Sequence, residues 1–132
     1  MNFLDQLFTW LQASFANQDT SEIRGYSFNL VENGGEFSVE LIGSPEFDDE
    51  GPDWACDEVF VGTPRSIPIP QPIHEGHWEK CLENMVRVLS DYLECGDVNA
   101  QILKRAEGTS TGFVDGELVT IFRRNKPDAT DG

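Results

Sequence analysis

The hydrophobic residues at the start of the chain recur at intervals of three and four, which is the spacing of one side of an α-helix. This stripe consists of Leu4, Leu7, Phe8, Leu11 and Phe15, and it is widened by Phe3 and Trp10. Asp5, Gln6 and Gln12 interrupt any secretory h-region, and no basic n-region precedes it. The pattern therefore predicts an amphipathic helix over residues 2–16, with one face on the core, in a protein that stays in the cytoplasm.

From Gly25 onwards, hydrophobic residues occupy every second position, which is typical of half-buried β-strands. The alternating positions are Tyr26, Phe28, Leu30, Phe37, Val39 and Leu41 against Ser27, Asn29, Val31, Ser38, Glu40 and Ile42. Between the two runs stands "ENGG", where we expect Asn33-Gly34 to supply the positive φ angles of a tight turn. The pattern predicts a β-hairpin.

The segment "DEVFVGTP" predicts a third strand, with Val59 and Val61 on one side and Phe60 on the other, ended by Pro64. It is followed by the proline-rich run "RSIPIPQPI". Proline offers no N–H to a strand ladder or a helix interior, so this run is excluded from both. We expect an extended crossover on the surface, anchored by its isoleucines, and a polyproline-type ligand is the alternative.

A second helical stripe follows the prolines. Its hydrophobic members are Trp78, Leu82, Met85, Val86, Leu89 and Leu93. Glu79, Glu83, Arg87, Asp91 and Glu94 fall on the opposite side. Gly96 ends the helix, because glycine tolerates the left-handed conformation that follows many helices.

The remaining sequence predicts a short third helix in "DVNAQILKRAEG" and a second hairpin in "TSTGFVDGELVTIFRR", turning at Asp115-Gly116. The order is then α-β-β-β-α-(α)-β-β. We predict an α+β fold in which a mainly antiparallel sheet is packed by two main helices. Residues 1–125 form a single domain, and residues 126–132 form a polar tail.

The charge of the chain, and its uneven distribution, gives the first indication of function. The net charge is −15, and residues 1–64 hold thirteen acidic residues against one base, Arg24, which gives −12 for this half. Such a field repels nucleic acid and anionic lipid, and it speeds the encounter with a cationic surface. A high net charge also keeps a protein soluble. The charge alone therefore does not distinguish a surface for a cationic partner from a surface that only favours solubility.

The most acidic stretch, "EFDDEGPDWACDEVF", contains seven carboxylates in fifteen residues without a lysine or arginine. It also carries aromatic residues, which disordered acidic tails seldom do. Buried aromatic anchors surrounded by charges are typical of protein interfaces. We therefore predict a partner-binding surface made of Glu46, Phe47, Asp48, Asp49, Glu50, Asp53, Trp54, Asp57 and Glu58. Whether Trp54 belongs to the core or to the interface stays open.

Metal and cofactor chemistry has weak sequence support. His74, His77 and Cys81 offer zinc ligands, but the spacing is not HExxH and a fourth ligand is missing. The acidic stretch lacks the alternating ligands of a calcium-binding loop. The three cysteines include no CxxC pair, so we expect reduced thiols, with Cys81 and Cys95 packed as small hydrophobic residues. We expect no cofactor.

Catalytic motifs are also missing: the sequence has no GxSxG, P-loop or GxGxxG. Paired carboxylates alone could perform acid–base chemistry, as in glycosidases. We predict a binding protein rather than an enzyme.

Three segments resemble the immunity proteins of bacterial polymorphic-toxin and contact-dependent inhibition systems, which are small, acidic, cytoplasmic α+β proteins. They are "DWACDEVF" (Asp53–Phe60), "HWEKCLENMVRVLSDYLE" (His77–Glu94) and "GFVDGEL" (Gly112–Leu118), and they cover less than a third of the chain. The resemblance implies a tight inhibitor of a cognate toxin, often a basic nuclease. An acidic nucleic-acid mimic that inhibits a DNA-binding protein is the alternative, followed by a small enzyme or a metal-binding module. A mimic would space its carboxylates along an elongated face, whereas here they cluster in one stretch.

Overall fold

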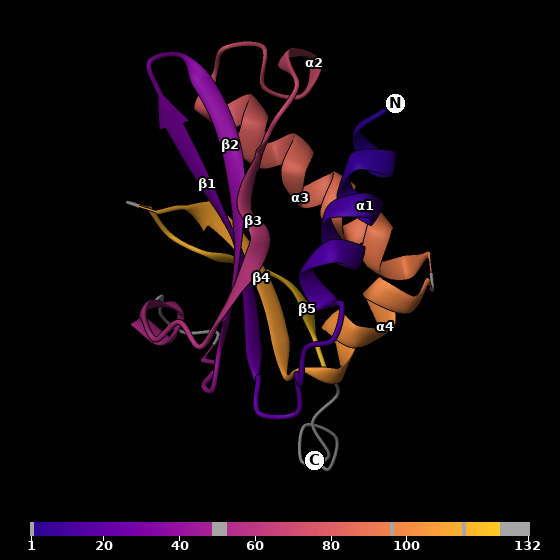
Figure 1. The fold of residues 1–132 in the computed structure, drawn as a ribbon. Helices are drawn as coiled ribbons and strands as arrows, with labels where there is room; N and C mark the ends of the chain where they lie inside the picture. Colours follow the sequence, from indigo (N-terminus) through magenta and orange to yellow (C-terminus); the bar gives the residue numbers. More distant parts are fainter. Residues whose placement is uncertain (1, 49–52, 96, 115, 125–132) are drawn as a thin grey trace.

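A computed structural model describes residues 2–48, 53–95, 97–114 and 116–124 of the chain (Figure 1). The expected tail at residues 126–132, Asp49, Glu50, Gly96 and Asp115 lie outside this description. The elements are α1 (Phe3–Phe15), β1 (Gly25–Asn33), β2 (Glu36–Ser44), the 3₁₀ turn η1 (Asp53–Cys56), β3 (Phe60–Pro68), α2 (Gln71–His74), α3 (Trp78–Glu94), α4 (Val98–Arg105), β4 (Gly108–Phe113) and β5 (Val119–Arg123).

The five strands form one sheet in the order β3-β2-β1-β4-β5, and α1, α3 and α4 cover one of its faces (Figure 1). The predicted α+β fold is confirmed. Three of the four strand pairings are antiparallel, but β1 and β4 run parallel, so the sheet is mixed. Parallel neighbours need a long crossover connection, and here the chain between β1 and β4 includes β2, β3 and helices α2, α3 and α4.

Helix α1 confirms the first predicted helix but turns a different side to the core. Leu4 and Phe8 are 50% and 40% exposed, whereas Trp10 is buried. Polar contacts with β3 explain this rotation. The Trp10 indole N–H donates to the Pro64 carbonyl at 2.6 Å, and the Ser14 hydroxyl accepts from the Thr63 N–H at 2.8 Å.

The β1–β2 hairpin is confirmed, but its turn lies one residue later than predicted. Asn33 pairs with Glu36, so the two loop residues are Gly34 and Gly35, with φ angles of 63° and 88°. A two-residue turn of this kind needs positive φ at both positions, which glycine adopts without steric cost.

The third predicted strand is present as β3, but Pro64 does not end it, and the strand continues to Pro68. The last three residues of the proline-rich run belong to α2 and not to an extended crossover. The prediction of a surface crossover is therefore wrong. Proline is tolerated here because β3 is the edge strand, which has a neighbour on one side only.

Helix α3 confirms the second predicted helix with a shifted buried face. Its buried residues are Cys81, Met85, Leu89, Tyr92 and Leu93. Trp78, predicted as the first core contact, is 54% exposed, and Leu82 is half-buried. Burial raises the pKa of the Cys81 thiol to about 11. Cys95 is exposed, contrary to its predicted packing, and the three cysteines are free thiols.

The last two predicted elements are confirmed. Asp97 caps α4, because its carboxylate accepts from the Ala100 N–H at 2.8 Å. Strands β4 and β5 form the second hairpin, and its turn brings Gly116, Glu117 and Leu118 next to the end of β4.

Candidate partner-binding surface

The acidic stretch is attached to the face of the sheet that the three helices leave uncovered, where η1 lies in Figure 1. Its attachment depends on two glycines that pair across β1 and β4, Gly25 and Gly108. A β-carbon on Gly25 would lie 2.5 Å from the Trp54 ring, and one on Gly108 would overlap the Phe47 ring. Because glycine has no side chain, both rings can pack directly against the backbone of β1 and β4.

The two rings also contact each other. Their centroids are 5.1 Å apart in an edge-to-face arrangement, which is a favourable geometry for aromatic pairs. Trp54 is 4% exposed, and its carbonyl accepts from the Ser44 hydroxyl at 2.8 Å. Phe47 is half-buried, with the Arg123 guanidinium 6.0 Å from its ring centroid. The structure thus places Trp54 in the interior, where it holds the stretch to the sheet.

The carboxylates of the stretch take the opposite position. Those that the structure describes are exposed: Glu46, Asp48, Asp53, Asp57 and Glu58. Asp49 and Glu50, also predicted for the site, lie outside the described residues. The stretch therefore combines a buried Trp54 ring and a half-buried Phe47 ring with exposed carboxylates.

A groove of about 340 Å³ separates η1 from the β4–β5 turn. Glu40 and Asn29 contribute to its lining from the sheet, and Asp53 and Cys56 contribute from η1. Arg65 joins two of its carboxylates, with Glu58 at 2.9 Å and Glu40 at 3.6 Å. Hydrogen bonding to Glu58 raises the pKa of Arg65, so this cation stays charged and neutralises part of the groove.

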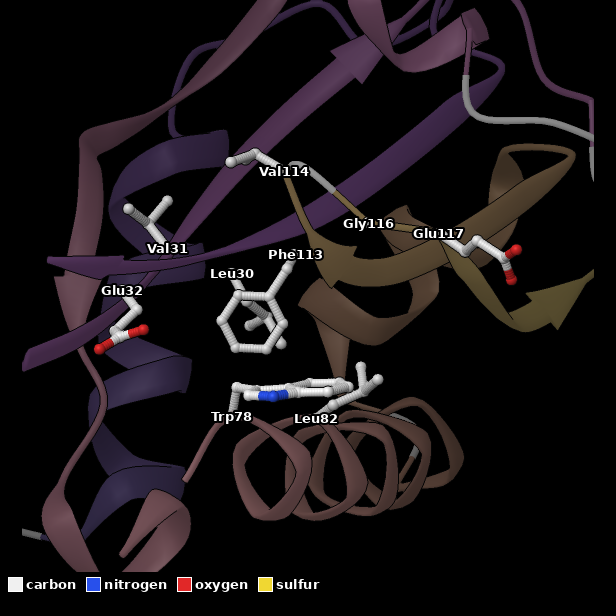
Figure 2. A pocket seen from close by; sticks show the side chains of 9 residues that line it. All are labelled: Leu30, Val31, Glu32, Trp78, Leu82, Phe113, Val114, Gly116 and Glu117. Atoms are coloured by element: carbon white, nitrogen blue, oxygen red, sulfur yellow. The ribbon is translucent and has the colours of Figure 1, made fainter. Parts of the chain in front are cut away.

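A second hollow, of about 400 Å³, lies where the first turn of α3 meets the ends of β1 and β4 (Figure 2). Trp78 and Phe113 form its aromatic wall, with ring centroids 6.2 Å apart at an angle of 89°. Leu30 lies behind them, and Glu32 and Glu117 stand on opposite sides of the rings (Figure 2). We call this hollow the Trp78 pocket.

The sequence pattern does not reveal this pocket, because Trp78 falls on the hydrophobic stripe of its helix and is predicted as a core residue. One signal was available. Gly76 and the prolines before it prevent the helix from starting earlier, so Trp78 stands in its first turn, at the margin of the core. Its partner Phe113 arrives from β4, which no helical periodicity could indicate.

The groove and the Trp78 pocket share a wall. Phe113, Val114 and Gly116 line both hollows, so these lie on the two sides of the β4–β5 turn. The acidic stretch borders the groove through Asp53 and Glu58. The groove, the Trp78 pocket and the acidic stretch therefore meet around the β4–β5 turn, and we call these three features together the acidic face.

The structure places the candidate zinc ligands in different surroundings. His74 is buried, stacks on Phe37 with a centroid distance of 4.3 Å, and accepts from the Gly76 N–H through Nδ1. His77 is exposed at the start of α3, while Cys81 is buried. Among the described residues, no group of three or more His, Cys, Asp or Glu side chains is arranged to hold a metal ion.

Comparison with family models, with curated proteins and with solved structures finds no match for this chain. Within the described ranges, no helix has the length and apolar character needed to cross a membrane.

Proposed function

We propose that this protein is an immunity-type inhibitor: it binds a cognate toxin that has a basic surface and neutralises it through the acidic face. A nuclease is the toxin class that suits it best, because an enzyme that binds a polyanion needs a cationic cleft. The observation that carries the proposal is the attachment of the acidic stretch to the sheet by Phe47 and Trp54, while the carboxylates that the structure describes are exposed.

Attachment supports a binding role for a thermodynamic reason. A free acidic segment would lose conformational entropy when a partner orders it, which weakens binding. Here η1 and its two rings fix part of the stretch beforehand. The carboxylates are therefore preorganised before the partner arrives.

The distribution of charge supports a cationic partner. The first half of the chain carries −12 of the net −15, and it includes β1, β2 and the acidic stretch. A field concentrated on one region orients a basic partner during the encounter and raises the association rate. Clustering around one turn also favours a local contact over mimicry of a nucleic-acid backbone.

The test is co-expression with the toxin encoded beside the gene, with cell growth and complex formation as readouts. We expect rescue of growth and a stable complex on size exclusion. The variant Glu46→Gln/Asp53→Asn/Asp57→Asn should weaken both. The matched control, Glu83→Gln/Asp91→Asn/Glu94→Gln, removes the same charge from the exposed side of α3 and should behave as the wild type.

Two results would contradict the proposal. One is the absence of any complex between the wild-type protein and that toxin. The other is an equal effect of the two triple variants, which would mean that net charge alone matters. If the protein instead displaces DNA from an unrelated DNA-binding protein, the nucleic-acid mimic would replace it.

A further inference from the structure

We infer that the Trp78 pocket takes an arginine side chain from the basic partner. This deepens the proposed function, on which it rests for the identity of the partner. It adds a specific contact to a surface otherwise described by its charge. The inference depends on three properties of the pocket: its exposed aromatic wall, the sign of its charges and its position.

The aromatic wall is available to a ligand. Trp78 is 54% exposed, although a tryptophan is usually largely buried. Its indole contacts Phe113 and lies beside Leu82, so it is positioned by neighbours and still presents surface to the pocket (Figure 2). Tryptophan is enriched among the residues that contribute most of the binding energy in protein interfaces.

The charges of the pocket select a cation. Glu32 and Glu117 are both exposed and lie at opposite ends of the pocket, with the Glu117 carboxylate turned away from the rings (Figure 2). Among the described residues that line the pocket, none is basic. This distinguishes it from the neighbouring groove, where Arg65 already pairs with Glu40 and Glu58. Of the two hollows, only the groove has a basic residue in its described lining, so the carboxylates of the Trp78 pocket have no cation among the described lining residues.

Arginine matches this combination better than other side chains. Its methylene stem packs on apolar surface, its planar guanidinium stacks on aromatic rings, and its fork pairs with carboxylates. Lysine offers a compact, more strongly hydrated charge and stacks less well. An uncharged apolar side chain would leave Glu32 and Glu117 unused.

The position of the pocket joins it to the proposed binding surface. Phe113, Val114 and Gly116 separate it from the groove that borders the acidic stretch. A partner that covers the stretch and the β4–β5 turn therefore reaches the pocket without a second interface. Acidic side chains therefore border both hollows, with Asp53 at the groove and Glu32 and Glu117 at the Trp78 pocket.

The first experiment uses three capped tripeptides, Gly-Arg-Gly, Gly-citrulline-Gly and Gly-Glu-Gly, and follows the tryptophan indole N–H signals by NMR. Citrulline keeps the shape of arginine without its charge. The glutamate peptide tests the opposite sign, because α3 begins at Trp78 and helix N-termini attract anions. Trp10 and Trp54 are buried and act as internal references.

We expect the arginine peptide to shift the Trp78 signal alone and the citrulline peptide to bind roughly threefold to tenfold more weakly. The double variant Glu32→Gln/Glu117→Gln should weaken arginine binding by a similar factor, and added salt should do the same. Equal binding of the arginine and citrulline peptides, preference for the glutamate peptide, or no Trp78 response would overturn the inference.

The second experiment measures dissociation of the toxin complex. Trp78→Leu keeps an apolar contact with Phe113 and Leu82 while removing the indole, and we expect it to speed dissociation roughly tenfold or more. Phe8→Leu, on the exposed side of α1, is the matched control and should change nothing. A complex whose dissociation ignores Trp78→Leu would refute the pocket contact alone, whereas failure of the wild type to bind would refute the proposed function.

Discussion

Trp54 and Trp78 both stand among acidic residues in the sequence, yet they end in opposite positions. Trp54 is 4% exposed and Trp78 is 54% exposed. The difference comes from what lies opposite each ring. Trp54 meets Gly25, whose missing side chain admits the ring to the sheet surface, whereas Trp78 meets Phe113 at the margin of the core. An aromatic residue among acidic residues can therefore either be buried and hold the acidic segment to the sheet, as Trp54 does, or remain exposed and available for contact, as Trp78 does.

The Phe47–Trp54 pair and Trp78 are therefore expected to have different roles. Phe47 and Trp54 hold the acidic stretch in place, so their removal should act on folding. Trp78 contributes little to the core, so its removal should act on binding. The predictions below test this division, beginning with the largest expected effect.

Trp54→Ala should lower the free energy of unfolding by about 3–5 kcal/mol, the usual cost of deleting a large buried aromatic ring. Trp78→Ala should cost less than about 1 kcal/mol, because half of that side chain is already in water. Urea denaturation of both variants measures the difference. If both variants lose the same free energy of unfolding, the division between a structural Trp54 and a binding Trp78 is wrong.

Gly108→Ala should lower the free energy of unfolding by about 1–3 kcal/mol, because the new methyl group overlaps the Phe47 ring. Gly116→Ala is the control: its β-carbon would come no closer than 3.7 Å to the Phe113 carbonyl oxygen, an ordinary contact. Thermal melts of both variants provide the measurement. If Gly108→Ala leaves the stability unchanged, the packing of Phe47 against Gly108 does not contribute to folding.

The thiols extend the contrast between buried and exposed positions. Cys56 and Cys95 should react quickly with a thiol reagent, and Cys81 only when the protein opens. Burial raises the pKa of Cys81 from 9.0 to about 11, which means that folding favours the protonated thiol. Its contribution to stability is therefore complete below about pH 9 and is lost as the pH rises towards 11.

Cys81→Ala provides the control for that pH dependence. Denaturation curves across this pH range should fall more steeply for the wild type than for the variant. Parallel curves would contradict the assignment of the buried proton to Cys81.

The smallest effect on stability is expected for Glu46→Gln/Asp53→Asn/Asp57→Asn. Exposed carboxylates contribute little to folding, so the free energy of unfolding should change by less than about 0.5 kcal/mol. Association with the basic toxin should nevertheless slow, and its salt dependence should flatten. The Debye length falls from about 10 Å at 0.1 M salt to about 3 Å at 1 M, which screens the wild-type steering. Surface plasmon resonance at several salt concentrations measures both quantities.

Periodicity predicted most of the fold, because hydrophobic spacing reports which side of an element is buried. It predicted the presence of α3 and of the β1–β2 hairpin, although the buried face of α3 is shifted and the hairpin turn lies one residue later than predicted. It failed for Leu4 and Phe8, since the face that α1 buries is decided by two hydrogen bonds with β3: Trp10 donates to Pro64, and Ser14 accepts from Thr63. Such contacts join residues far apart in the sequence and leave no local pattern.

The site was harder to predict than the fold for the same reason. The acidic stretch was visible as composition, but its attachment requires Gly25 and Gly108 to be neighbours. That pairing depends on the parallel contact between β1 and β4, which the sequence pattern did not indicate. The Trp78 pocket likewise needs Phe113 to arrive from β4 at the start of α3.

The edge strand β3 limits how a partner can dock on that side. An exposed sheet edge presents a row of backbone N–H and carbonyl groups that another chain can extend, including a second copy of the same protein. Pro64 and Pro68 lie in β3 and have no N–H to offer such a chain. This edge is therefore poorly suited to backbone pairing. Recognition there has to proceed through side chains, and accidental growth of the sheet into aggregates is disfavoured.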